Sequence, residues 1–157
     1  MERSGEGSQL GTQGFTGKYH LTVDDKSRVV IVSALRRELC GRVVLRKNRR
    51  QGCVEVLPPQ VWNAFLSKLS ALSALDSDVQ RLITLESASA VEVNIDKQGR
   101  MLFPAEMRSF AAVSGPEVVV TGANDRLKVW APEVWAQFEQ QAATEDLEAR
   151  VFAKYGL

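Results

Sequence analysis

The clearest hydrophobic pattern of the chain begins at residues 91–95, where Val-Glu-Val-Asn-Ile alternates apolar and polar side chains. This period of two is typical of a half-buried strand. Gly99 can adopt a positive φ, which favours a tight turn after the strand, and Pro104 suits the first position of a helix. The pattern therefore predicts a strand, a turn, a short strand and a short helix, over residues 91–95, 96–99, 101–103 and 105–110.

Two further apolar runs, residues 118–120 and 127–130, flank the turn-forming sequence Gly-Ala-Asn-Asp at 122–125. This arrangement predicts a second hairpin. Pro132 then opens an acidic helix that we expect to continue to about residue 150, with one apolar face made by Val134, Trp135 and Phe138.

The same succession occurs earlier in the chain. Residues 23–36 resemble residues 95–108 at an offset of 72, and residues 59–65 resemble 132–138 at an offset of 73. A repeat this long predicts two copies of one structural unit, related by a pseudo-two-fold axis. In the first copy we expect strands at 18–24, 29–32, 43–47 and 53–57, helices at 34–39 and 59–72, and a further helical piece at 73–87 with Asp76 as its N-cap.

An isolated hairpin is marginally stable in water, and its edges are open to pairing with other chains. Four hairpins from two copies can close on one another, so we expect an α+β, mainly β fold: a small barrel of interleaved hairpins with helices outside. The expected organisation is a disordered, glycine-rich tail over 1–14, a first repeat over 15–87, and a second repeat with a C-terminal helix over 88–157.

Composition narrows the class of protein. The 157 residues are 45% hydrophobic and 25% charged, which is ordinary for a globular domain, and no apolar run is long enough to span a bilayer. His20, Cys40 and Cys53 are too few and too scattered for a zinc or disulfide framework. No nucleophile–base pair, phosphate-cradling loop or dinucleotide fingerprint is present, so we expect no enzyme, no cofactor, no small-molecule substrate, no membrane partner and a cytoplasmic location.

Charge is unevenly distributed although the net charge is only +1. Residues 15–65 hold ten Lys or Arg against four Asp or Glu, whereas residues 88–138 hold five against six. One basic half in a nearly neutral chain suggests that a single face meets a polyanion.

Each copy holds an Asp and an Arg four positions apart across a turn: Asp24 with Arg28, and Asp96 with Arg100. One interpretation is structural, in which the Asp caps turn amides and pairs with the Arg. The other sends the Arg outward to phosphate oxygens or a guanine edge, which suit the planar guanidinium. Both can hold, because an Asp can orient an Arg that also touches DNA.

A basic cluster at residues 46–50, Arg-Lys-Asn-Arg-Arg, is expected in the loop of the first copy's second hairpin. The second copy has nothing similar at 121–125. The cluster is either an ordinary solvated loop or an electrostatic contribution to DNA binding that does not depend on base sequence.

The second turn, Asp-Lys-Gln-Gly-Arg at 96–100, is followed by Phe-Pro-Ala at 103–105 and by Arg108. This sequence resembles the signature of the MraZ family of bacterial transcriptional regulators. The first turn, Asp-Asp-Lys-Ser-Arg at 24–28, resembles that family's other motif, and the resemblance covers about residues 15–150.

The resemblance implies a tandem AbrB-like swapped-hairpin fold, assembly into ring-shaped homo-oligomers, and a nucleoid-associated, cytoplasmic protein. It implies a repressor-type regulator that binds short G-rich direct repeats upstream of the division and cell-wall gene cluster, including its own gene. Tandem sites suit a ring because linked weak contacts add avidity. The candidate DNA-binding residues are Arg28, Arg100, Lys26, Lys97, Arg46, Lys47, Arg49 and Arg50, and the turn-forming residues are Asp24, Ser27, Asp96 and Gly99.

The first copy departs from the family pattern. Ser27 replaces the usual Gly, at a cost of roughly 1 kcal/mol for a left-handed turn, Val32 replaces a Pro, and Thr16 replaces an Arg. An alternative function is therefore an oligomeric scaffold for protein partners, with lost or weakened DNA binding, which the acidic C-terminal helix could serve.

Overall fold

The structure, a computed structural model, describes residues 14–36, 39 and 41–157. The tail predicted for residues 1–14 lies almost wholly outside this range, as does part of the helix predicted for 34–39. In chain order the elements are β1 (Lys18–Thr22), β2 (Arg28–Val30), α2 (Ser33–Arg36), β3 (Gly41–Asn48), β4 (Cys53–Leu57), α3 (Pro59–Ser70), α4 (Ser77–Ser89), β5 (Val91–Ile95), β6 (Arg100–Leu102), α5 (Ala105–Phe110), β7 (Glu117–Gly122), β8 (Leu127–Trp130), α6 (Pro132–Thr144) and α7 (Leu147–Tyr155).

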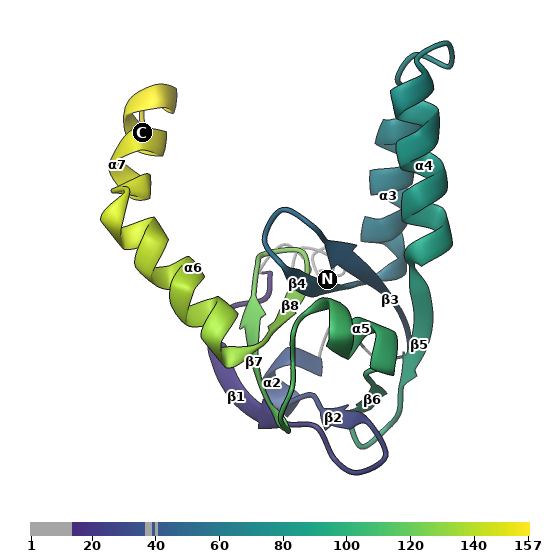
Figure 1. Cartoon of the computed structure of the whole chain (residues 1–157), viewed down its shortest axis with the longest axis vertical. Helices are drawn as coiled ribbons and strands as arrows, with labels where there is room; N and C mark the ends of the chain where they lie inside the picture. The colour runs from purple at the N-terminus through teal and green to yellow at the C-terminus, as the bar shows by residue number, and fades with distance from the viewer. Residues whose placement is uncertain (1–13, 37–38, 40) are drawn as a thin grey trace, which may run out of the picture.

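These strands form one antiparallel sheet in the order β1-β7-β8-β4-β3-β5-β6-β2. A single bridge between Val23 and Val29 joins its two ends, so the sheet nearly closes into a barrel (Figure 1). Strands of one copy pair with strands of the other: β1 with β7, β3 with β5, and β2 with β6. The predicted mainly β, swapped-hairpin barrel with outer helices is confirmed.

The register reveals the pseudo-two-fold axis. Val29 pairs with Met101, its equivalent 72 residues later, and Glu55 pairs with Lys128, its equivalent 73 residues later. A two-fold axis passes midway between two equivalent residues that face each other. The axis therefore passes through the β2–β6 pair and through the β4–β8 pair. Because these two pairs are separated by two strands on either side of the barrel, they lie opposite each other.

The barrel interior is filled by side chains from both copies. Val29 and Met101 are fully buried at one end of the axis, and Val54, Leu127 and Val129 are fully buried at the other. Burial of each such aliphatic side chain stabilises the fold by about 1.5–3 kcal/mol. The buried residues of both copies form one continuous cluster, so neither repeat has a separate core.

A smaller apolar cluster joins α6 to the outside of the barrel. Cys53, Val119 and Trp130 are buried there against Trp135 and Phe138 of α6. The ring centroids of Trp130 and Trp135 are 5.1 Å apart in an edge-on arrangement. Burial raises the pKa of Cys53 to about 12, so its thiol stays protonated.

Four helices form two arms that project from the barrel, α3 with α4 and α6 with α7, whereas the short helices α2 and α5 lie against the barrel (Figure 1). The predicted cap of α4 is confirmed, since the Asp76 carboxylate accepts the backbone N–H of Asp78 at 3.0 Å. The single helix predicted from residue 132 to about 150 is wrong: Asp146 takes a left-handed conformation (φ 51°), which ends α6 at Thr144 and starts α7 at Leu147. Within the described residues, no helix is long and apolar enough to cross a membrane.

Candidate nucleic-acid interface

The first turn is organised around the Asp24 carboxylate. Its Oδ1 accepts the backbone N–H groups of Lys26 (2.8 Å) and Arg28 (2.9 Å). Its Oδ2 accepts the Arg28 Nε–H at 3.3 Å. Ser27 completes the turn at φ +62°, a conformation that glycine adopts with less strain.

The second turn repeats these contacts one by one. Asp96 Oδ1 accepts the backbone N–H groups of Gln98 and Arg100, both at 2.9 Å. Asp96 Oδ2 accepts the Arg100 Nε–H at 2.7 Å, which is shorter than the matching bond in the first turn. Gly99 takes φ +85° here and is buried.

Both Asp side chains are held in the ionised form. Chiefly the backbone N–H of Arg28 lowers the pKa of Asp24, and that of Arg100 lowers the pKa of Asp96. Each carboxylate thus fixes its turn and at the same time holds the Nε side of its guanidinium. Both arginines keep solvent exposure, 33% for Arg28 and 41% for Arg100, and Arg100 Nη2 donates to Gln98 Oε1 at 3.4 Å. A guanidinium oriented in this way can still bind a planar acceptor.

Hydrogen bonds between the copies bring the two turns together. The Ser27 carbonyl accepts the N–H of Phe103 (2.7 Å), and the Gly99 carbonyl accepts the N–H of Ile31 (2.8 Å). Figure 1 shows both turns at the lower end of the barrel, away from the helical arms. The exposed Lys26 and Lys97 lie in the same turns, so four of the candidate DNA-binding cations share one end of the molecule.

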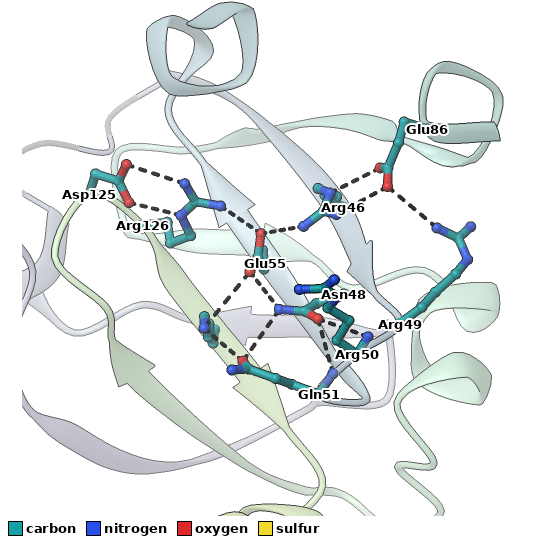
Figure 2. Close-up of polar contacts among 10 residues, drawn as sticks. Arg46, Asn48, Arg49, Arg50, Gln51, Glu55, Glu86, Asp125 and Arg126 are labelled. Carbon is teal, nitrogen blue, oxygen red and sulfur yellow. Dashed lines mark hydrogen bonds and ion pairs between the residues drawn. The ribbon is translucent and has the colours of Figure 1, made fainter. Parts of the chain in front are cut away.

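The basic cluster is divided between a strand and a loop. Arg46 and Lys47 lie within β3, as the strand predicted over 43–47 requires and contrary to the loop predicted for the whole cluster, whereas Arg49 and Arg50 lie in the turn after it. Arg46 binds Glu86 of α4 with two parallel bonds, at 2.9 and 3.0 Å, and reaches Glu55 of β4 at 3.0 Å (Figure 2). Its guanidinium also lies 4.7 Å from the centroid of the Phe65 ring. Burial alone would lower the pKa of Arg46, but the bonds to Glu86 and Glu55 outweigh it and raise that pKa.

Glu55, only 3% exposed at its side chain, joins cations from both copies. Besides Arg46, it accepts Arg126 Nη1–H and Asn48 Nδ2–H, both at 2.8 Å. Lys128 stands 3.9 Å away. Burial would raise the pKa of Glu55, but the hydrogen bond from Arg126 and the other bonds outweigh it and lower that pKa. The sequence analysis missed this network, although an acid in the middle of an otherwise apolar strand was a signal.

The rest of the cluster also has protein contacts. Arg49 stands 3.7 Å from Glu86 and donates to Ser89 at 3.1 Å, while Lys47 stands 3.7 Å from Glu106. Arg50 is exposed. The cluster lies on β3 and in the loop between β3 and β4, and so apart in the fold from the two turns that hold Arg28 and Arg100. A DNA role for these four cations stays a prediction.

Fold and site together define a class: a tandem swapped-hairpin barrel that presents two oriented arginines at one end. Comparison with known proteins identifies the family. The family described as "MraZ protein, putative antitoxin-like" matches residues 15–84 and again residues 87–153. The chain therefore belongs to the MraZ family.

Curated relatives agree with this assignment. The chain is 36% identical to the transcriptional regulator MraZ of Thermoanaerobacter pseudethanolicus, over 78% of this chain and 84% of that protein. It is 33% identical to the transcriptional regulator MraZ of Carboxydothermus hydrogenoformans, over 87% and 96%. It is 32% identical to the protein of the same name in Moorella thermoacetica, over 83% and 90%.

Proposed function

We propose that this chain is a transcriptional regulator that binds double-stranded DNA in a sequence-specific manner through Arg28 and Arg100. The observation that carries the proposal is the pairing of two matched turns, each with a carboxylate-oriented arginine, at one end of the axis. The relatives named as transcriptional regulators support it.

The chemistry of the site suits a DNA groove. The guanidinium Nη groups match the O6 and N7 acceptors of guanine, and the adjoining Lys26 and Lys97 suit phosphate oxygens. The two arginines are the first residues of β2 and β6, which pair with each other, and a two-stranded ribbon of this kind fits the width of a major groove. Arg28 and Arg100 would therefore contact bases, and the lysines would add affinity that does not depend on sequence.

The proposal extends to assembly and to the genes controlled. Self-association is supported by exposed apolar side chains on the two arms: Leu82 and Leu85 of α4, and Val151 and Phe152 of α7. A ring of subunits bound to short direct repeats gains avidity from several weak contacts. As the motif resemblance implies, the target is the DNA upstream of the division and cell-wall gene cluster and of its own gene, in a cytoplasmic protein associated with the nucleoid.

A second function, an assembled scaffold without DNA binding, is favoured by one observation. Ser27 holds a left-handed conformation where Gly99 stands in the other copy, so the first turn is the more strained of the two. If that strain has loosened Arg28, assembly would persist while DNA recognition is lost.

A titration of the protein against DNA separates the two functions. The probe is the DNA upstream of its own gene, labelled and measured by gel shift at two salt concentrations against a scrambled duplex. We expect specific binding, with about 10- to 100-fold weaker binding by Arg28→Ala and by Arg100→Ala, because a good bidentate arginine contact contributes about 1–3 kcal/mol.

The matched control is Arg81→Ala, which removes an exposed arginine of α4 whose one ion pair among the described residues is with Asp78. It should bind like the parent protein, and sizing by light scattering should give one assembly state for all variants. Wild-type affinity in both turn variants would overturn the assignment of these arginines. Intact assembly with no specific shift would instead support the scaffold.

A further inference from the structure

The two turns differ in their contacts with the short helices α2 and α5, which follow β2 and β6. Arg36, at the end of α2 in the first copy, lies over the second copy's turn. Its Nη1 donates to the carbonyl of Lys97 at 3.2 Å. Its Nε and Cδ lie 2.7 and 2.8 Å from the position that a Cβ on Gly99 would occupy. Arg36 therefore fills the space that exists because residue 99 has no side chain.

The equivalent contact is absent from the other turn in the described part of the chain. Arg108, the counterpart of Arg36 on α5, donates instead to the carbonyl of Gly115 at 3.2 Å. At the position equivalent to Gly99, the other turn has Ser27, which carries a Cβ. One turn thus has a support from the opposite copy, and the other lacks it.

The placement of Arg36 has a cost. Its Nε is buried without a hydrogen-bond partner among the described residues. A buried donor without a partner is rare in native structures and calls for a compensating role. The role that the contacts indicate is support of the second turn, because the carbonyl that Arg36 holds belongs to Lys97, in the loop between Asp96 and Arg100.

We propose that Arg36 is a positioning residue that holds the second turn in its binding geometry from the opposite copy, so that Arg100 is pre-organised and Arg28 is the adaptable partner. The inference rests on the proposed function in one respect, that Arg100 contacts DNA. Fixing a side chain before binding lowers the entropy lost on association, so the support acts on affinity through Arg100. The shorter Arg100–Asp96 bond, 2.7 Å against 3.3 Å for Arg28–Asp24, agrees with this division.

A first measurement needs no DNA. Amide hydrogen exchange by NMR is compared in the full chain, in Arg36→Ala and in the matched variant Arg108→Ala. In Arg36→Ala we expect the amides of Gly99 and Arg100 to exchange about tenfold faster, the loss of one hydrogen bond to a charged donor. The amides of Ser27 and Arg28 should keep their rates, and Arg108→Ala should leave both turns unchanged.

The second measurement is a cycle of double variants in the DNA titration. Arg36→Ala should weaken specific binding about tenfold alone and again in an Arg28→Ala background, but by no more than about twofold in an Arg100→Ala background. In the Arg100→Ala background, adding Arg36→Ala should also leave the dependence of DNA binding on salt concentration unchanged. A direct phosphate contact by Arg36 would instead lower the slope of that salt dependence by about one.

Each outcome is decisive. Exchange at Gly99 and Arg100 that is unchanged from the parent in Arg36→Ala, or that is accelerated equally at Ser27 and Arg28, would overturn the support, whatever the protein does with DNA. Faster exchange with an additive loss in the Arg100→Ala background would overturn its action through Arg100. Faster exchange in a protein that binds no DNA specifically would support the structural contact while the proposed function itself fails, so the two failures are distinguishable. Thermal unfolding of Arg36→Ala, compared with the parent, shows that the fold is intact.

Discussion

The turn at residues 24–28 and the turn at residues 96–100 contain the same hydrogen bonds, whereas the β4 and β8 strands at the other end of the axis differ. Both turns have a carboxylate that accepts two backbone amides and one guanidinium Nε. At the opposite end, Glu55 faces its own equivalent, and that equivalent is a lysine, Lys128. The two copies thus have matching side chains in the turns, where both would contact one ligand. They have different side chains in the β4–β8 pair, where one copy contacts the other.

This difference has a physical reason. In a true homodimer, two identical glutamates on a two-fold axis would repel each other. Duplication within one chain permits an acid on one copy and a base on the other, so Glu55 can bind Arg126 and approach Lys128. The same freedom allows Ser27 in one turn and Gly99 in the other. Fusion of the repeats thus favours asymmetry in the scaffold while the paired arginines keep their common geometry.

The largest predicted effect on stability comes from removing the Glu55 carboxylate from the β4–β8 end of the axis. Glu55→Gln should lower the free energy of unfolding by about 1.5–3 kcal/mol, because Arg46 and Arg126 would lose their shared carboxylate while each keeps its second acidic partner, Glu86 or Asp125. Urea unfolding followed by circular dichroism measures the change. The control is Glu92→Gln at an exposed position of β5, which should change stability by less than about 0.5 kcal/mol. Equal values for the two variants would mean that the network contributes no net stability.

The same carboxylate predicts how stability responds to acid. The pKa of Glu55 is lowered in the folded protein from an ordinary value of 4.5. Its contribution is therefore fully present above about pH 5, and it is lost as the pH falls through the lower, folded-state value. The unfolding free energy, measured from pH 7 to pH 3, should fall more steeply in the parent protein than in Glu55→Gln. Parallel curves would show that Glu55 titrates alike in the folded and unfolded states.

A change of intermediate size tests the turn that Arg36 supports. Gly99→Ser places a Cβ at φ +85° and within 2.8 Å of the Ile31 carbonyl and of Arg36. We expect destabilisation of roughly 1–3 kcal/mol from strain and displaced contacts. Gly41→Ser is the matched control, since Gly41 has the same φ of +85° and open space around it. Its smaller loss isolates the backbone strain, and no difference between the variants would show that Arg36 moves aside freely.

Sequence reasoning succeeded where the determinants are local. The alternation at 91–95, the prolines at the starts of α3 and α6, and the turn chemistry around Asp96 and Gly99 predicted those elements, and the structure has them at or within a residue or two of the expected positions. The interleaving of the two copies was also predicted, because a repeated hairpin cannot close its edges alone.

The errors concern contacts between distant residues. A strand was expected over residues 43–47, but nothing in the basic run indicated that Arg46 would pair with Glu86, 40 positions away in sequence. The sequence around Asp146 did not indicate that its backbone takes a left-handed conformation and ends α6. Local composition does not specify which distant residue Arg46 binds or that Asp146 takes a positive φ, so both features became clear only from the structure.

The smallest predicted effect restores symmetry between the turns. Ser27→Gly removes a Cβ from a residue at φ +62°, a relief of roughly 1 kcal/mol, which the greater flexibility of unfolded glycine offsets by about 0.5–1 kcal/mol. The unfolding free energy should therefore rise by only a few tenths of a kcal/mol in urea titrations. Removing the Cβ also opens the space beside the first turn that Arg36 uses beside the second. Slower exchange at Arg28 in this variant, abolished by adding Arg108→Ala, would show that Arg108 has moved to support the first turn. Unchanged exchange would mean that Ser27 alone does not account for the difference between the two turns.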